Sequence, residues 1–113
     1  MERPTWVTNE HHWRANCREI VERSRDLLDG RLGVIQAARA LRGFAFRVRA
    51  EQDEDFMLFR VIDSESDALP TGVERAQWSA TALAREDARI AAFEDNWRAQ
   101  AREAAQNLIL KYT

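Results

Sequence analysis

The last third of the chain is a long stretch without glycine or proline, and this feature limits the possible folds more than any other. Residues 79–113 are rich in alanine, arginine and glutamate, which are strong helix formers. We expect one helix of about 30 residues and about 45 Å, capped by Ser79 or Thr81. Its apolar stripe follows helical spacing: Leu83, Ile90, Trp97, Ala101, Ala104 and Leu108, widened by Phe93 and Ala105.

Two further helices are predicted near the N-terminus. The first begins at Thr8 or Asn9, either of which is a competent N-cap, and ends at Asp29-Gly30. The second follows after a short link, which predicts an antiparallel pair, and we expect Gly43 to stop it. The stripes of the two helices are Trp13, Cys17, Ile20, Val21, Ser24, Leu27 and Leu28, and then Leu32, Ile35, Ala38 and Leu41.

The middle of the chain is predicted to hold one shorter helix. Residues 44–49 alternate apolar and charged side chains, and because no second strand exists to pair with them, we interpret them as a loop or the tail of the second helix. Asp53 is a plausible N-cap for a helix that runs through residues 54–64. Pro70 and Gly72 then mark the strongest break in the chain.

The predicted fold is therefore all-α, a single-domain antiparallel helical bundle of about four helices with a long C-terminal helix. One domain covers residues 1–113, and residues 1–8 form an N-terminal arm. Trp6 lies in this arm, where it is either a packing anchor or an exposed interface residue.

Composition excludes several classes of protein. No window approaches the ~20 apolar residues of a membrane span, and the N-terminus lacks the pattern of a signal peptide, so we expect a cytoplasmic protein with no membrane partner. The net charge of −2 argues against nucleic-acid binding. Cys17 is the only cysteine, and His11-His12 lack metal-ligand spacing. We predict no catalytic residue, metal or cofactor.

Charge is divided unevenly along the chain. Residues 14–49 hold nine arginines against four acids, whereas residues 51–67 hold seven acids against Arg60 alone. Carboxylates at a helix C-terminus are disfavoured by the helix dipole, so those near residue 65 call for partners, and Arg39 and Arg75 are natural ones. Ion pairing, contact with a protein partner and acid–base chemistry all remain open for this segment. The predicted partner-binding residues are Glu51, Asp53, Glu54, Asp55, Asp63, Glu65 and Asp67.

The apolar stripe of the last helix also contains Asp87 and Glu94, on the seam between its large residues. Buried carboxylates need partners, because otherwise their pKa values shift and they become neutral. We therefore expect an interior polar network of Arg39, Arg75, Asp87 and Glu94. The same residues could line a small-ligand pocket.

From Leu28 to Tyr112 the chain resembles a poorly characterised family of small bacterial helical proteins of unknown function. The resemblance covers about three-quarters of the chain. It implies a helical fold and a bacterial origin, and it transfers no activity. It is carried by the turn and helix at residues 30–41, Asp55-Phe-x-x-Phe, the run Ile62-x-Ser-Glu-x-Asp-x-Leu-Pro-x-Gly, Arg75-x-x-Trp78, and Ala82-Leu83 followed by Asp87 and Glu94.

These features favour a non-enzymatic protein-binding module, such as a bacterial immunity or antitoxin-like inhibitor of a basic toxic effector. A concentrated acidic segment would speed the encounter with a basic partner. One alternative is a helical homo-oligomer, including a homodimer, that uses the long last helix. Another is a small-ligand binder or enzyme that uses the interior carboxylates.

Overall fold

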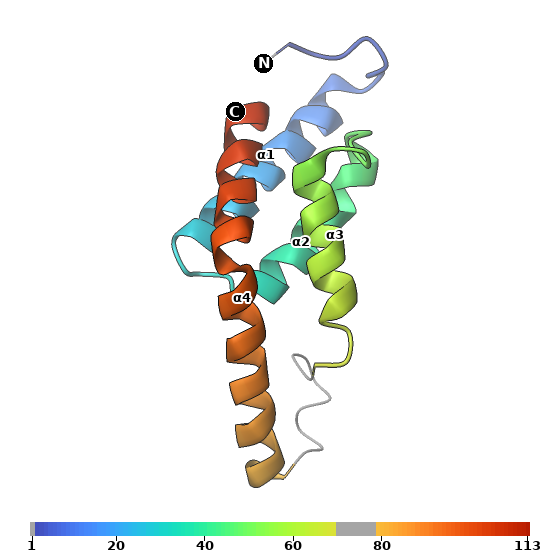
Figure 1. Cartoon of the computed structure of the whole chain (residues 1–113). Helices are drawn as coiled ribbons and strands as arrows, with labels where there is room; N and C mark the ends of the chain where they lie inside the picture. The colour runs from blue at the N-terminus through green and yellow to red at the C-terminus, as the bar shows by residue number, and fades with distance from the viewer. Residues whose placement is uncertain (1, 70–78) are drawn as a thin grey trace.

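Four helices in up-and-down order form the protein, and their arrangement is seen in a computed structural model that describes residues 2–69 and 79–113. They are α1 (Glu10–Leu28), α2 (Val34–Arg47), α3 (Glu54–Glu65) and α4 (Ala80–Tyr112). Figure 1 shows consecutive helices running in opposite directions, and no strand occurs among the described residues. The predicted all-α bundle with a long C-terminal helix is therefore confirmed.

Local capping explains where α1 begins and ends. The side chain of Asn9 accepts a hydrogen bond from the backbone N–H of His12 at 3.0 Å, so Asn9 is the N-cap. Gly30 follows the helix with φ of +79°, a left-handed conformation that glycine adopts without a steric penalty. The prediction that the helix ends at Asp29-Gly30 is confirmed.

Helix α2 continues through Gly43 to Arg47, so the predicted stop at Gly43 is wrong. A glycine inside a helix costs about 1 kcal/mol relative to alanine. Burial on either side of it outweighs that cost, because Leu41 and Ala45 both lie in the core. Most of residues 44–49 are thus the tail of α2, one of the two predicted alternatives.

The predicted N-caps of the other two helices are confirmed. Asp53 accepts a hydrogen bond from the backbone N–H of Asp55 at 2.8 Å, and α3 ends at Glu65, one residue later than predicted. Ser79 accepts one from the backbone N–H of Ala82 at 3.2 Å and begins α4. The predicted break at Pro70 and Gly72 lies outside the described residues.

The core lies between α1, α2, α3 and the C-terminal part of α4. Val7 is buried in it and Trp6 packs against it, so the N-terminal arm is attached to the bundle. Of the two tryptophans on predicted stripes, Trp13 is buried and Trp97 lies partly buried at the margin. Side chains with no exposed surface in this core include Ile20, Leu41, Phe59, Ile62 and Leu108.

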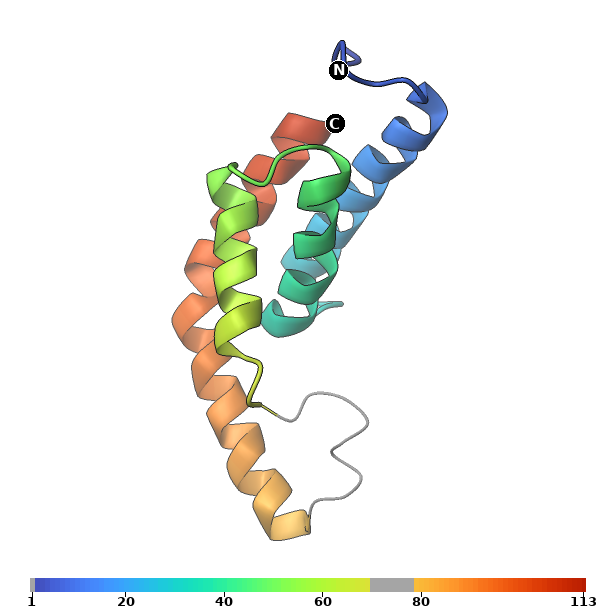
Figure 2. The same cartoon turned by 90° about the vertical axis from the view of Figure 1, so that its right-hand side faces the viewer.

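Helix α4 is longer than the bundle that it helps to build. Its 33 residues span about 50 Å at 1.5 Å per residue, and the molecule measures 53 × 26 × 23 Å. All of its buried residues lie near the C-terminal end: Ala101, Ala104, Ala105 and Leu108. Figure 2 shows the other half of α4 extending past the ends of α1, α2 and α3. In the two described ranges, no helix is long and apolar enough to cross a membrane.

Candidate functional site

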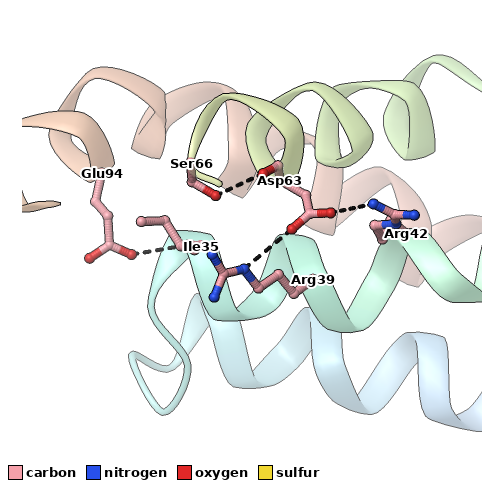
Figure 3. Close-up of polar contacts among 6 residues, drawn as sticks. All are labelled: Ile35, Arg39, Arg42, Asp63, Ser66 and Glu94. Atoms are coloured by element: carbon pink, nitrogen blue, oxygen red, sulfur yellow. Dashed lines mark hydrogen bonds and ion pairs between the residues drawn. The ribbon is translucent and has the colours of Figure 1, made fainter. Parts of the chain in front are cut away.

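The most enclosed ionised group described is Asp63, whose carboxylate points from α3 toward α2 (Figure 3). Its side chain is 10% exposed, and its two oxygens accept hydrogen bonds from Arg39, at 3.3 Å, and from Arg42. Ser66 closes the helix end by donating its hydroxyl to the Asp63 carbonyl at 3.0 Å. A carboxylate with both oxygens bonded to guanidinium groups holds α2 and α3 together, which is a structural role.

Glu94 makes a different contact from the one expected. Its carboxylate reaches from α4 to the first turn of α2 and accepts the backbone N–H of Ile35 at 3.0 Å (Figure 3). The N-terminus of a helix carries partial positive charge and unpaired N–H groups, so it favours an anion there. Gly33 leaves room for it, because a Cβ at that position would lie 2.8 Å from a Glu94 carboxylate oxygen. Glu94 therefore ties α4 to α2.

Two described members of the predicted interior network make separate contacts. Arg39 pairs with Asp63, whereas Glu94 binds the backbone of α2. Asp87 is exposed, so the expectation that it lies inside the bundle is wrong. The physical reason is that Asp87 lies in the N-terminal half of α4, which contributes no buried side chain. Arg75 lies outside the described residues, as does Trp78.

Two acids of residues 51–67, Asp53 and Asp55, are also held by contacts within the fold. Lys111 of α4 donates to Asp53 at 2.8 Å and to Asp55 at 2.7 Å, and Asn107 donates to Asp55 at 3.1 Å. The hydrogen bonds with Asp53 and then Asp55 raise the pKa of Lys111. These contacts fasten the start of α3 to the end of α4. Asp53, Asp55 and Asp63 are therefore structural and offer little surface to a partner.

Four of the predicted partner-binding acids remain on the surface: Glu51, Glu54, Glu65 and Asp67. Two of them flank exposed apolar residues on the outer face of α3. Met57 is 45% exposed and Val61 is 43% exposed, and they lie between Glu54 and Glu65 at three- and four-residue spacing. We call Glu54, Met57, Val61 and Glu65 the α3 ridge.

A groove of about 370 Å³ runs between α1 and the end of α4, and Cys17, Val21 and Tyr112 are among the residues that line it. Burial raises the pKa of the Cys17 thiol, and burial raises the pKa of Tyr112 to about 12. Both groups are therefore neutral near pH 7, and a protonated thiol is a poor nucleophile.

The described histidines and acids do not form a metal-binding cluster either. His11 and His12 are exposed in the first turn of α1. Among the residues that the structure describes, no three histidine, cysteine or acidic side chains lie close enough together to hold a metal ion.

Several contacts were not predicted from the sequence. Lys111 is the only lysine of the chain, in a protein with sixteen arginines. That exception was the one sequence signal for its contacts with Asp53 and Asp55. Arg42 lies three residues after Arg39, a spacing that places both side chains on one helical face, and this spacing was the available signal. Nothing in the local pattern marked Glu94 as a cap, because Ile35 is 59 residues away.

Comparison with known proteins returned no relative: no family model, no curated protein sequence and no solved structure matches the chain.

Proposed function

We propose that the protein is a non-enzymatic protein-binding module of the bacterial cytoplasm, and that it binds its partner through the α3 ridge. The observation that carries the proposal is the exposure of Met57 and Val61 between two acids. Exposed apolar residues rimmed by charge are typical of protein interaction sites. The acids at both ends favour a partner whose surface is basic.

An inhibitor of a toxic effector is the specific form of this module that we propose. A basic active site is attracted by acids on an exposed helix, and Glu51 and Asp67 extend the acidic surface beyond the two ends of α3. Such an inhibitor acts by occupying a surface, so it needs no catalytic group of its own. Its affinity would come mainly from Met57 and Val61, and its speed of association from the acids.

Affinity capture from a lysate of the source organism, with mass spectrometry and light scattering, tests the proposal. We expect a basic protein bound in 1:1 ratio by the natural chain and not by Glu54→Lys/Glu65→Lys. The double variant should fold normally, because both side chains are exposed. The matched control is Glu19→Lys/Glu103→Lys, which reverses two exposed acids on α1 and α4 and should retain the partner.

Two outcomes would contradict this proposal. A partner that both double variants capture equally well would show that the α3 ridge is not the interface. A chain that captures nothing, and that light scattering finds as a dimer or larger assembly, would favour the homo-oligomer instead. That alternative rests on the N-terminal half of α4, which has no buried side chain among the described residues.

A further inference from the structure

Phe46, near the end of α2, leaves 78% of its surface exposed, which is unusual for a phenylalanine. It borders a groove of about 520 Å³ between the end of α2, the start of α1 and the N-terminal segment. We call this the Trp6–Phe46 groove, and it is lined by Trp6, His12, Asn16, Phe46, Arg47, Arg49 and Glu51. Tryptophan and arginine are the residue types that most often dominate binding energy at interfaces.

Two guanidinium groups of the groove are held against aromatic rings. Arg49 lies 4.6 Å from the ring centre of Trp6, and Arg47 lies 5.1 Å from that of Phe44. Neither arginine has an ion-pair partner among the residues that the structure describes. Both are therefore positioned by rings and keep their hydrogen-bond donors available for carboxylates.

Arg49 lies in the turn that ends α2. Its φ is +53°, and among the described residues it is the only one other than glycine with a positive φ. This φ is accounted for by the turn, because Arg49 follows the C-cap Val48 and the backbone N–H of Ala50 bonds to the carbonyl of Ala45 at 2.7 Å. From this turn the guanidinium of Arg49 lies over the ring of Trp6.

Asn16 adds a polar side chain to the groove. It is only 6% exposed, and its side-chain amide makes no hydrogen bond within the described part of the chain. The amide is not among the fully enclosed polar atoms that lack a partner, so it meets solvent in the groove and can be reached by a ligand there. An amide has both donors and an acceptor, so it can pair with the peptide unit of an extended chain.

We propose that the Trp6–Phe46 groove binds an acidic peptide segment of a second partner protein. An apolar side chain of that segment would pack on Trp6 and Phe46, and its carboxylates would bind Arg47 and Arg49. Asn16 would hold its backbone. This site is separate from the α3 ridge, and it stands or fails independently of the function proposed above.

A peptide fits the groove better than a single-stranded nucleic acid does. Aromatic rings and arginines occur in both kinds of site. A nucleic acid, however, needs a series of cations along its phosphates, whereas this groove has two arginines, one histidine (His12) and the carboxylate of Glu51 at its side. That carboxylate would repel a phosphate backbone, while an acidic peptide can place an uncharged residue next to it.

Fluorescence anisotropy with three labelled probes tests the proposal on the full chain. The probes are a short peptide of aspartate and glutamate around a central phenylalanine, the same peptide with asparagine and glutamine, and an oligouridine. We expect saturable binding of the acidic peptide, at least about tenfold tighter than of its amide counterpart, since bonds to charged groups are the stronger ones. Oligouridine should not bind.

Three variants and a control connect the binding to the groove. Arg49→Gly and Phe46→Ser should each weaken the acidic peptide about tenfold or more. Asn16→Ala should weaken it without lowering the melting temperature, because the amide that it removes has no partner. A purely structural asparagine would not behave in this way. Arg18→Ala removes an exposed arginine of α1 and should leave the affinity unchanged.

Each contrary result overturns the proposal. Equal binding of the acidic and amide peptides, or no binding of the acidic peptide at millimolar concentration, would exclude recognition of carboxylates. Unchanged affinity in both Arg49→Gly and Phe46→Ser would place the binding elsewhere. Tighter binding of oligouridine than of the acidic peptide would assign the groove to nucleic acid.

Discussion

The two halves of α4 share one apolar stripe and have different surroundings. Residues 97–112, the packed half, contribute all four buried side chains of the helix. Residues 80–96, the distal half, contribute none, although Leu83, Ile90 and Phe93 continue the same stripe. The packed half is therefore stabilised by burial. The distal half is stabilised by helix propensity and by pairs such as Arg89 with Glu86 at 2.8 Å, and it contacts the bundle near its end, through Phe93 and Glu94. The spacing of apolar residues shows which face of a helix is apolar, but it does not show how deeply the other helices cover that face.

The largest difference between the two halves should appear when one leucine in each is replaced by alanine. Leu108 has no exposed surface, so Leu108→Ala should lower the free energy of unfolding by about 2–5 kcal/mol. Leu83 is only partly covered, so Leu83→Ala should cost about 1 kcal/mol or less. Urea unfolding followed by circular dichroism measures both. Equal losses would mean that the two halves are equally covered.

Alkaline pH should act on the packed half through Tyr112, the only tyrosine of the chain. Its pKa is raised from 10.0 to about 12 by burial, so the folded protein holds the phenolic proton more tightly than the unfolded chain does. The stabilisation is complete below pH 10 and is lost as pH rises through about 12. Two pKa units correspond to about 2.7 kcal/mol, and because Tyr112 keeps part of its surface in water, we expect a loss of about 1–2 kcal/mol.

Absorbance at the wavelength of tyrosinate gives the titration directly, and urea unfolding at each pH gives the free energy. Tyr112→Phe is the matched control, because it keeps the ring against Phe56 and removes the proton. A stability curve of the same slope in both proteins, or a phenol that titrates near 10, would contradict the assignment.

Glu94 lies where the two halves meet, and its substitution should have a smaller effect. Glu94→Gln keeps an oxygen near the Ile35 N–H and removes the charge at the start of α2, which should cost about 0.5–1 kcal/mol. Hydrogen exchange of the first turn of α2 should become faster. Asp95→Asn changes the neighbouring exposed acid and should leave that exchange rate as it was.

The smallest expected difference concerns cooperativity along α4. Ala99→Gly and Ala88→Gly each place a glycine at an exposed helix position, one in each half. The first should cost about 1 kcal/mol of global stability, the full difference in propensity. The second should cost less, because a half without buried side chains can fray while the bundle stays folded. If both lowered global stability by the same amount, the halves would unfold as one unit.

Much of the fold could be predicted from short patterns. Asn9, Asp53 and Ser79 are N-caps in the sequence and in the structure, because a cap needs only the next three residues. The predicted end of the second helix at Gly43 was wrong, because the burial of Leu41 and Ala45 depends on helices that are distant in sequence. Local propensity is a weak guide wherever tertiary packing opposes it.

The candidate sites could be predicted less well, for the same physical reason. A run of acids is visible in the sequence, but which of them are neutralised depends on partners such as Arg42 and Lys111 from other helices. Asp53, Asp55 and Asp63 therefore turned out to be structural. The exposure of Phe46 was equally invisible, because an aromatic residue in an alternating segment predicts a buried position.

The buried thiol of Cys17 is a natural probe of how often the bundle opens. This thiol is 3% exposed, lies beside Tyr112, and is the only one in the chain. Because the thiol lines the groove with little exposed surface, a thiol-specific reagent should react with it slowly in the folded bundle and faster when α1 and the end of α4 separate. No label has to be engineered, and the same measurement can be repeated on every variant described above.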